Sequence, residues 1–396
     1  LRPFIETSAR PETLANLSDN SVTTTSHHAE ADLQFMDVAL SLARRGVGTT
    51  SPNPSVGCII VQEGIVIGRG WTQPGGRPHA ETMALAQAGV KSTKSTIYVT
   101  LEPCAHHGKT PPCAEALIQA GIKRCVIAIQ DTDERVAGQG IKLLQDAGIG
   151  VSVGVRAEVA GEINSGFFKR ISEGRPHFTL KTATSLDGKI ATKAGESKWI
   201  TGSQARSMGH ALRARHDAIL TGMGTVRADN PELTCRLPGM QDYNPIRIIL
   251  DPLQNVSRET ILIQTSKICP VWIITGPDVD SEYTETLESL GARVIHCEIN
   301  SDGRINLIAL AKMLGDEGLT RVLVEGGAEI SASFLKARLI DELIWFRAPF
   351  VIGGDGLSAI AGVSLARLID ASRLKRTDIL HLGEDVMERY LFKKRE

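Results

Sequence analysis

The chain has 396 residues, which at roughly 150 residues per domain predicts two to three domains. Its 44 Lys and Arg residues almost balance 45 Asp and Glu residues, so a net charge of −1 gives no global basic field to attract nucleic acid. With 42% hydrophobic residues and no apolar run of roughly 18–20 residues, the composition excludes a membrane-spanning protein. Seven cysteines, an odd number, do not form a disulfide framework and favour a reducing cytoplasm.

Residues 1–28 are polar and rich in Ser, Thr and Asn, which predicts a disordered leader. The Ser and Thr content also allows a transit peptide, although Glu6, Glu12 and Asp19 count against that alternative.

Apolar residues at a spacing of three to four predict a helix from Ala29 to near Gly46. Alternating strands and helices then follow, which indicates a largely parallel sheet between layers of helices. The expected strands are 57–62, 65–69, 96–101, 125–129 and 150–155, and the expected helices are 79–87, 113–120, 141–147 and 157–171.

The polar segment from Ser172 to Pro176 is typical of a linker, so the sequence predicts two α/β domains, at 29–172 and 176–396. The second domain repeats the alternation of strands and helices. Its expected strands are 177–183, 218–221, 246–251, 271–275, 293–296, 321–324 and 342–347, with helices at 204–215, 305–314 and 329–337.

His79, Cys104 and Cys113 have the residue types of a catalytic zinc site. One imidazole and two thiolates leave the fourth tetrahedral position open for water, whose pKa zinc lowers towards neutrality. Glu81, two residues from the ligand His79 and not itself a ligand, is placed to carry a proton from that water to a leaving amine. The order His-x-Glu followed by Pro-Cys matches the H-x-E…P-C-x-x-C signature of zinc nucleobase deaminases, except that eight residues instead of two separate the cysteines here.

Two other interpretations of these residues remain open. His79 is otherwise an ordinary helix-cap histidine beside two buried apolar cysteines. A closed structural zinc site would need a fourth ligand, which His106 or His107 would supply.

The loop from Pro103 to Cys113 reads P-C-A-H-H-G-K-T-P-P-C, and residues 50–57 upstream read T-S-P-N-P-S-V-G. Over about residues 33–155 this pattern resembles the deaminase domain of the bifunctional riboflavin-biosynthesis deaminase/reductase family. The resemblance implies a cytidine-deaminase-like three-layer domain that acts on a diaminopyrimidine carrying a phosphoribosylamino group. It also implies that Asn53 holds the pyrimidine and that Lys109 and Asp131 contact the base or the ribose phosphate. The sequence departs from the common family pattern at Thr72 and at Thr132-Asp133, so substrate contacts are not assigned there.

A second candidate site lies where the expected strand 321–324 runs into Glu325-Gly326-Gly327-Ala328 and then a helix. Glycines at a helix N-terminus let backbone N–H groups meet a phosphate. No G-x-G-x-x-G motif follows a strand, and Gly222-Met223-Gly224 is only a partial match. Taken alone, a strand followed by two glycines and a helix is equally a tight turn without a ligand.

Four further motifs occur in order: K-T-A-T-S-L-D-G-K-I from 181, E-S-K-W-I-T from 196, L-R-A-R from 212 and T-G-M-G-T-V-R-A-D-N-P-E-L-T-C-R from 221. Together they resemble the reductase domain of the same family, over about residues 176–394, which implies a dihydrofolate-reductase-like α/β fold that uses NADPH. The residues implied to line NADPH are Thr184, Trp199, Thr225, Asp229, Gly327, Ala328, Glu329, Ile330, Ser331, Ala332 and Ser333. Those implied to hold the phosphoribosyl substrate are Ser197, Arg213, Leu233, Arg236 and Glu325.

The residue types suit this chemistry. Arg213 and Arg236 can each bind a phosphate bidentately. Reduction of an opened ribose needs a hydride donor and a nearby proton source, for which Lys181 and Asp187 are the candidates. Each of these residues also has an ordinary structural interpretation, since Arg213 lies on an expected helix surface and Asp187-Gly188 is a common turn.

We therefore expect a cytoplasmic, homo-oligomeric bifunctional enzyme with one Zn²⁺ per chain and NADPH, acting on a small molecule and not on nucleic acid. The first domain would deaminate 2,5-diamino-6-(5-phosphoribosylamino)pyrimidin-4-one, and the second would reduce the ribosyl group to ribityl. The alternatives are a nucleoside or tRNA deaminase with a non-catalytic C-terminal domain, and a metal-dependent scaffold whose reductase half has decayed.

Overall fold

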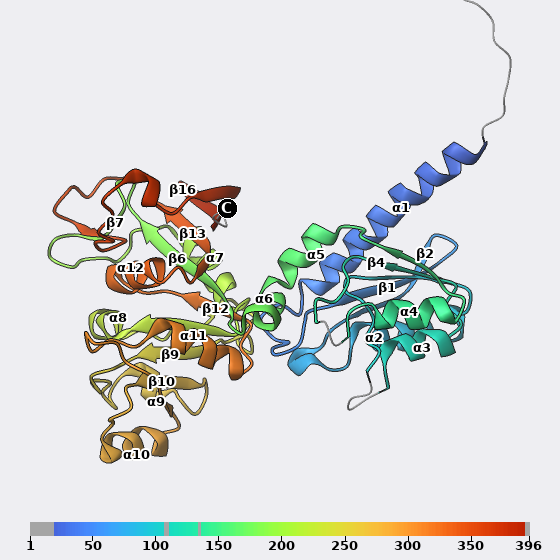
Figure 1. Cartoon of the computed structure of the whole chain (residues 1–396). Helices are drawn as coiled ribbons and strands as arrows, with labels where there is room; N and C mark the ends of the chain where they lie inside the picture. Colours follow the sequence, from blue (N-terminus) through green and yellow to red (C-terminus); the bar gives the residue numbers. More distant parts are fainter. Residues whose placement is uncertain (1–19, 107–110, 134–135, 393–396) are drawn as a thin grey trace, which may run out of the picture.

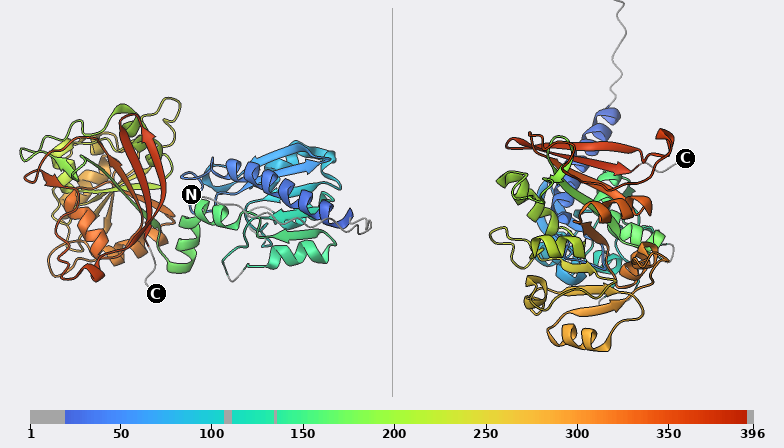
Figure 2. Two further views of the ribbon diagram at one scale, coloured as in Figure 1. Left: turned by 90° about the horizontal axis from the view of Figure 1, so that it is seen from above. Right: turned by 90° about the vertical axis from the view of Figure 1, so that its left-hand side faces the viewer.

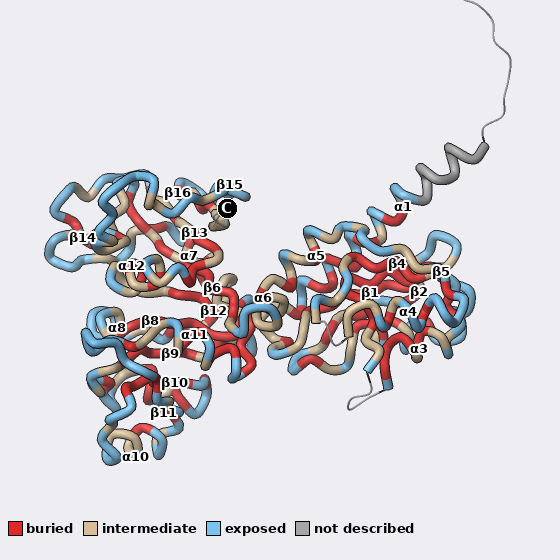
Figure 3. The backbone as a smooth tube through the Cα atoms, in the orientation of Figure 1, coloured by how far each residue is buried: buried red, intermediate tan, exposed pale blue. Residues whose placement is uncertain are grey.

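The computed structural model describes residues 20–106, 111–133 and 136–392, with side chains from residue 29 onwards. These residues form two α/β lobes that meet at helix α6 (Ser165–Glu173) (Figure 1). The strands of each lobe are largely buried, whereas loops and outer helix faces are exposed (Figure 3). Within the described residues, no helix is long and apolar enough to cross a membrane.

The N-terminal lobe is built on a five-stranded sheet with the order β2-β1-β3-β4-β5. Strand β1 is antiparallel to both β2 and β3, and only β3, β4 and β5 run parallel. A turn at Glu63-Gly64 joins the first two strands, which form a hairpin. The bounds are β1 (Gly57–Gln62), β2 (Ile65–Trp71), β3 (Thr96–Val99), β4 (Arg124–Ile127) and β5 (Gly150–Val153).

Helices cover both faces of this sheet, which confirms the expected three-layer domain. Side chains of a strand alternate between faces, so Cys58 and Ile60 pack with the helices of one face, while Ile59 packs with those of the other. The first face carries α2 (Ala80–Ala88), α3 (Cys113–Gln119) and α4 (Gln139–Asp146), and the second carries α1 (Asn20–Ala43) and α5 (Ala157–Ile163). Figure 2 shows α1 lying across the sheet.

Two expected helix bounds in this lobe are wrong. Helix α1 begins at Asn20 instead of Ala29, and the chain has no Gly or Pro between Glu12 and Arg45 to stop a helix. The expected single helix 157–171 is broken at Asn164 into α5 and α6. The buried Asn164 amide accepts a hydrogen bond from Ser55 N at 2.8 Å and donates one to Ser55 O at 3.0 Å, which ties this break to the start of β1.

The C-terminal lobe is built on a nine-stranded sheet with the order β11-β10-β9-β8-β12-β6-β13-β16-β15. The strands from β11 to β13 run parallel, and β16 is antiparallel to both of its neighbours, β13 and β15. The parallel strands are β6 (His177–Thr184), β8 (Ala218–Gly222), β9 (Ile246–Leu250), β10 (Val271–Thr275), β11 (Arg293–His296), β12 (Arg321–Val324) and β13 (Ile340–Arg347).

The sequence analysis missed four strands of this lobe, namely the hairpin β15 (Leu374–Leu382) and β16 (Asp385–Phe392) and the small pair β7 (Lys189–Ala191) and β14 (Leu357–Ser358). Strand β15 is exposed along nearly its whole length at the sheet edge, so its sequence lacks the alternation of a half-buried strand.

The helices of this lobe also lie on both faces of the sheet. One face carries α11 (Leu307–Asp316) and α12 (Ala328–Lys336), and the other carries α8 (Met223–Asp229), α9 (Ile261–Gln264) and α10 (Ser281–Ser289). Helix α7 (Ser203–Arg213) packs on β13 and β16. The sequence analysis expected α7, α11 and α12 and missed the other three.

The two lobes are joined by hydrogen bonds as well as by the chain. Arg321 Nη2, from β12, donates to Glu162 O at 2.8 Å, to Ile163 O at 2.9 Å and to Ser165 Oγ at 2.8 Å, at the C-terminal end of α5. Ser51 Oγ donates to Gly318 O at 2.6 Å. The Arg321 bonds join the start of β12 to the junction of α5 and α6. The Ser51 bond joins the loop before β1 to the turn that precedes β12.

Candidate functional site

The three candidate zinc ligands come together in the N-terminal lobe. His79 immediately precedes α2, Cys104 follows the end of β3, and Cys113 opens α3. His79 Nδ1 lies 3.3 Å from Cys113 Sγ and 3.7 Å from Cys104 Sγ, and all three ligand atoms lie within 4.8 Å of one another. Tetrahedral zinc with ordinary Zn–S and Zn–N bonds separates such ligand atoms by about 3.6 Å. The side chains therefore fit this metal.

No fourth protein ligand joins this group among the described residues. His106, which the sequence analysis considered as one, is exposed and not part of the cluster, and His107 lies outside the described residues. Three ligands leave one tetrahedral position open, as in catalytic zinc sites.

The environment of the cluster lowers the pKa of Cys104, which favours binding of a cation, and raises the pKa of Glu81, which favours proton transfer. A hydrogen bond from Cys113 lowers the pKa of Cys104 to about 4, and the Cys113 backbone N–H donates to the same sulfur at 3.3 Å. Glu81, in the first turn of α2, is 4% exposed. Burial raises the pKa of its carboxyl to about 7.

The sequence analysis missed Glu102, which lies two residues before Cys104 and whose hydrogen bonds hold the backbone there in place. Its buried carboxylate accepts four backbone N–H bonds, at distances of 2.9–3.3 Å, which join the end of β3 to the start of α4. The four donors are Asp131, Gly138, Gly140 and Ile141. The available signal was an acidic residue at the end of an apolar strand, directly before Pro103-Cys104.

We expect Glu102→Ala to lower the free energy of unfolding of the N-terminal lobe by roughly 1–3 kcal/mol, because buried N–H groups lose their acceptor. Calorimetry of the full chain should show a lower unfolding temperature for this lobe, and zinc should dissociate faster in a chelator assay. Glu102→Gln retains one acceptor oxygen and should have a smaller effect. An Ala variant with unchanged unfolding and unchanged zinc release would contradict the assigned role.

Of the three residues expected to bind the deaminase substrate, the structure describes Asn53 and Asp131. Asn53 lies in the loop before β1, and its amide packs so closely on Gly76 that a Cβ there would lie 2.0 Å from Nδ2. Asp131 follows β4, accepts the Asp133 N–H at 3.0 Å, and has its pKa raised by burial. Lys109 lies outside the described residues. Thr72, where the sequence departs from the family pattern, is buried, and its hydroxyl accepts the Val56 N–H at 2.9 Å.

The C-terminal lobe contains a cleft of about 1620 Å³ at the carboxyl ends of β6, β8, β9 and β12. In open α/β sheets this edge is the usual place for ligands. Gly327 precedes the nine-residue helix α12 and lines the cleft together with the first turn of that helix. Gly326 has no room for a side chain, because a Cβ would lie 2.6 Å from Ile330 Cβ. The volume exceeds that of a typical single-ligand pocket and suits a cofactor beside a substrate.

Most of the residues expected around NADPH and the phosphoribosyl substrate line this cleft. They are Trp199, Thr225, Asp229, Gly327, Ala328, Glu329, Ile330 and Ser333 on the cofactor list, and Ser197, Arg213, Arg236 and Glu325 on the substrate list. Lys181 also lines it.

Five expected site residues, all of them described, are not among the residues lining the cleft: Thr184, Asp187, Leu233, Ser331 and Ala332. Thr184 is buried and accepts a hydrogen bond from Trp345 Nε1 at 2.8 Å. Leu233 packs in the hydrophobic core, Ser331 Oγ donates to Gly327 O at 3.2 Å, and Ala332 is 2% exposed. Asp187 accepts hydrogen bonds from Ser185 Oγ at 2.6 Å and from Gly353 N at 2.8 Å.

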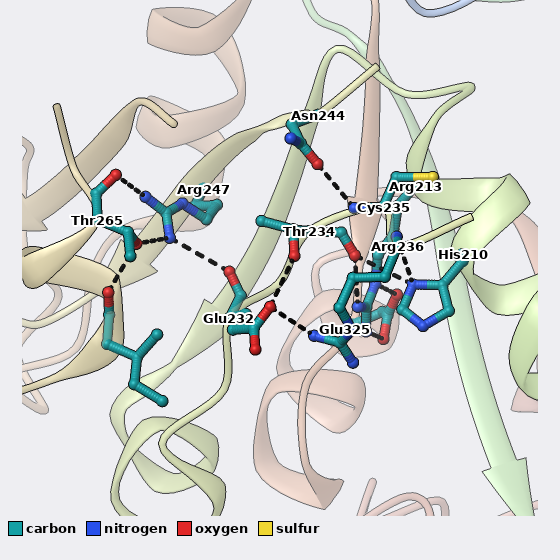
Figure 4. Close-up of polar contacts among 11 residues, drawn as sticks. His210, Arg213, Glu232, Thr234, Cys235, Arg236, Asn244, Arg247, Thr265 and Glu325 are labelled. Atoms are coloured by element: carbon teal, nitrogen blue, oxygen red, sulfur yellow. Dashed lines mark hydrogen bonds and ion pairs between the residues drawn. The ribbon is translucent and has the colours of Figure 1, made fainter. Parts of the chain in front are cut away.

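Arg213 was expected to bind a phosphate bidentately, but its guanidinium binds Glu325 and Thr234 instead (Figure 4). Its Nε and Nη2 each donate to a carboxylate oxygen of Glu325 at 2.9 Å, and its Nη1 donates to Thr234 O at 3.0 Å. Lys181 Nζ lies 3.5 Å from Glu325 Oε2. Although burial alone would raise the pKa of Glu325, Arg213 and Lys181 hold it below its usual value. Arg236 is more exposed and pairs with Glu232 at 3.0 Å.

The five cysteines outside the metal cluster are free and buried, namely Cys58, Cys125, Cys235, Cys269 and Cys297.

Comparisons with known proteins cover both lobes. A family model described as the RibD C-terminal domain matches residues 176–387, and one described as the cytidine and deoxycytidylate deaminase zinc-binding region matches residues 29–129. The riboflavin biosynthesis protein RibD of Bacillus amyloliquefaciens is 43% identical over 353 residues, which cover 89% of this chain and 94% of that protein. The Escherichia coli K12 protein of the same name is 41% identical over 368 residues, with 90% and 98% coverage.

Solved structures agree over almost the whole chain. Acinetobacter baumannii RibD, form 1, superposes with a TM-score of 0.83 at 37% identity, covering 92% of this chain and all of that one. A Thermotoga maritima structure described as a diaminohydroxyphosphoribosylaminopyrimidine deaminase/5-amino-6-(5-phosphoribosylamino)uracil reductase has a TM-score of 0.81 at 32% identity, with 93% and 100% coverage. This chain therefore belongs to the RibD family of bifunctional riboflavin-biosynthesis enzymes, with a zinc-dependent deaminase domain followed by an NADPH-dependent reductase domain.

Proposed function

We propose that this chain converts 2,5-diamino-6-(5-phosphoribosylamino)pyrimidin-4-one in two steps, deamination in the N-terminal lobe and reduction of the ribosyl group to ribityl in the C-terminal lobe. The observation that carries the proposal is the presence, in one chain, of an open three-ligand metal cluster and a large cleft at a helix N-terminus. The printed description of the Thermotoga maritima relative supports the same pair of substrates.

In the deaminase site, His79, Cys104 and Cys113 hold the metal. Zinc, when bound, lowers the pKa of a coordinated water and so supplies the nucleophile for the amine-bearing pyrimidine carbon. Glu81 takes a proton from the water and delivers it to the leaving amine, and its burial keeps bulk water from competing for that proton. Asn53 and Asp131 orient the substrate, and Lys109 provides a cation for its phosphate.

In the reductase site, the N-terminus of α12 with Gly327 receives the cofactor's phosphates, and Trp199, Thr225 and Asp229 line the rest of its path. NADPH, when bound, supplies the hydride. Arg236 and Ser197 hold the phosphoribosyl group, and Lys181 supplies the proton. Because Glu325 and Thr234 occupy most of the Arg213 guanidinium, Arg213 orients these two partners and is not the main phosphate ligand.

We further propose that the domains divide at residues 172–176, that the enzyme is a homo-oligomer of the cytoplasm, and that it does not bind nucleic acid. The end of α6 at Glu173 and the start of β6 at His177 support the division. The seven free cysteines support a reducing compartment, and the net charge of −1 disfavours nucleic acid. The match of residues 176–387 to a reductase-family model disfavours a nucleoside or tRNA deaminase with a non-catalytic C-terminal domain.

The proposal is tested by incubating the full chain with the diaminopyrimidine phosphate and identifying the products by mass. Without NADPH we expect a product in which one amino group is replaced by oxygen, and with NADPH the same product carrying two more hydrogens. Removal of zinc with a chelator should abolish the first change and spare NADPH oxidation on the deaminated compound. Deamination of free nucleosides, with no NADPH consumed on the deaminated compound, would overturn the proposal.

A further inference from the structure

The segment Asn230–Arg236, which leads from α8 towards β9, runs between the reductase cleft and the hydrophobic core. Arg236 lines the cleft, whereas Leu233 and Cys235 are buried. Asn230 and Leu233 have positive φ angles of 42° and 55°. A positive φ is costly for residues other than glycine. Contacts from the rest of the fold must therefore hold this backbone.

One set of contacts lies on the sheet side of the segment. Arg247, on β9, is fully buried, and its guanidinium donates to neutral oxygens: Thr265 Oγ1 at 2.7 Å, Thr265 O at 3.1 Å, Cys269 O, and Glu232 O at 3.3 Å. Figure 4 shows Arg247 on one side of the segment and His210 with Arg213 on the other. Arg247 thus fixes the first part of the segment to the core.

The other set of contacts comes from α7. His210 and Arg213, about one turn apart, both have a side-chain nitrogen at Thr234 O, with His210 Nδ1 at 3.1 Å and Arg213 Nη1 at 3.0 Å. A carbonyl only accepts, so His210 Nδ1 carries the hydrogen. Burial and the nearby Arg213 lower the pKa of His210, which favours the neutral ring. The Arg236 backbone N–H also points at Nδ1, at the longer distance of 3.4 Å. Because a protonated Nδ1 cannot accept this hydrogen, the shorter contact with Thr234 O, which cannot donate, assigns the hydrogen to Nδ1.

We infer that His210 is a positioning residue of the reductase: its Nδ1–H holds the Thr234 carbonyl and thereby sets where Arg236 meets the phosphate of the substrate. This inference rests on the proposed role of Arg236 in holding that phosphate. Arg213 shares the same carbonyl but also holds Glu325, so its loss affects two partners. The hydrogen-bond contacts of the His210 ring are both with the segment, although the residue also lines the cleft. His210 is therefore the residue at which the positioning effect can be measured separately.

The test measures steady-state reduction by the full chain, with the deaminated phosphoribosyl compound as substrate. His210→Ala should raise the KM for this compound roughly two- to tenfold, the range for one lost hydrogen bond. It should leave kcat, the KM for NADPH and the deaminase rate within about twofold, because none of these depends on Arg236. His210→Asn places an amide nitrogen near the position of Nδ1 and should restore the KM. His210→Gln places its amide nearer to Nε2 and should not.

A double-mutant cycle separates this inference from the function on which it rests. If Arg236→Gln alone leaves the substrate KM unchanged, the proposed role of Arg236 is wrong and the inference falls with it. If Arg236→Gln raises KM, adding His210→Ala should raise it little further, since His210 acts through Arg236. Additive effects, or rescue by Gln and not by Asn, would instead mean that His210 contacts the substrate through Nε2 and would overturn the inference. Should the Ala variant not fold, the Asn and Gln pair still decides the question.

Discussion

Replacing Glu81 with Gln is expected to lower the rate of ammonia release by roughly 10²–10⁴-fold, the usual contribution of a general acid or base. The amide keeps the size and much of the polarity of the side chain but cannot take up a proton from water. Zinc should remain at one ion per chain, because the ligand atoms belong to His79, Cys104 and Cys113. The measurement is ammonia release by the full chain, with the zinc content determined on the same preparation.

Two comparisons make this result specific. Glu158 also lies in the first turn of a helix of the same lobe, but it is exposed and outside the metal cluster, so Glu158→Gln should retain the full deaminase rate. NADPH oxidation on the deaminated compound should be unchanged in both variants, because the reductase cleft lies in the other lobe. Loss of zinc, or loss of NADPH oxidation, in Glu81→Gln would contradict the role given to this carboxylate.

The metal site could be predicted from sequence because its chemistry depends on a few residue types placed at the ends of regular elements. His79 precedes a helix and Cys113 opens one, and both helices were expected nearly where they are. Glu102 was missed because its role depends on backbone N–H groups 29–39 residues further along the chain. Nothing in the local sequence reports such a distant partner.

The reductase cleft was predictable only in part. The motifs place the right loops together, but they do not tell which way each side chain points. Thr184 ends β6 beside residues that line the cleft, yet its hydroxyl is bound to Trp345. Arg213 was expected to bind phosphate, but its Nε and Nη2 donate to the carboxylate of Glu325, 112 residues away in sequence. The edge strand β15 was missed because an exposed strand carries no hydrophobic alternation.

Replacing Lys181 with Met is expected to lower kcat for reduction by roughly 10²–10⁴-fold while deamination continues at its normal rate. Lys181 Nζ lies in the cleft, 3.5 Å from Glu325 Oε2, and is the cation placed to deliver a proton there. The Met side chain keeps most of the apolar stem but no proton. In the presence of NADPH, the deaminated but unreduced compound should therefore accumulate, which mass analysis of the products would show.

Asp187, the other proton-source candidate, provides the matched control. Hydrogen bonds from Ser185 Oγ and from the backbone of Gly353 lower the pKa of its carboxyl to about 2, so it is ionised at neutral pH and has no proton to give. It also lies outside the cleft lining. Asp187→Asn should accordingly keep kcat for reduction within about twofold of the unmodified enzyme. A loss of kcat in Asp187→Asn as large as that in Lys181→Met would show that the proton comes by way of the Asp187 turn and not from Lys181.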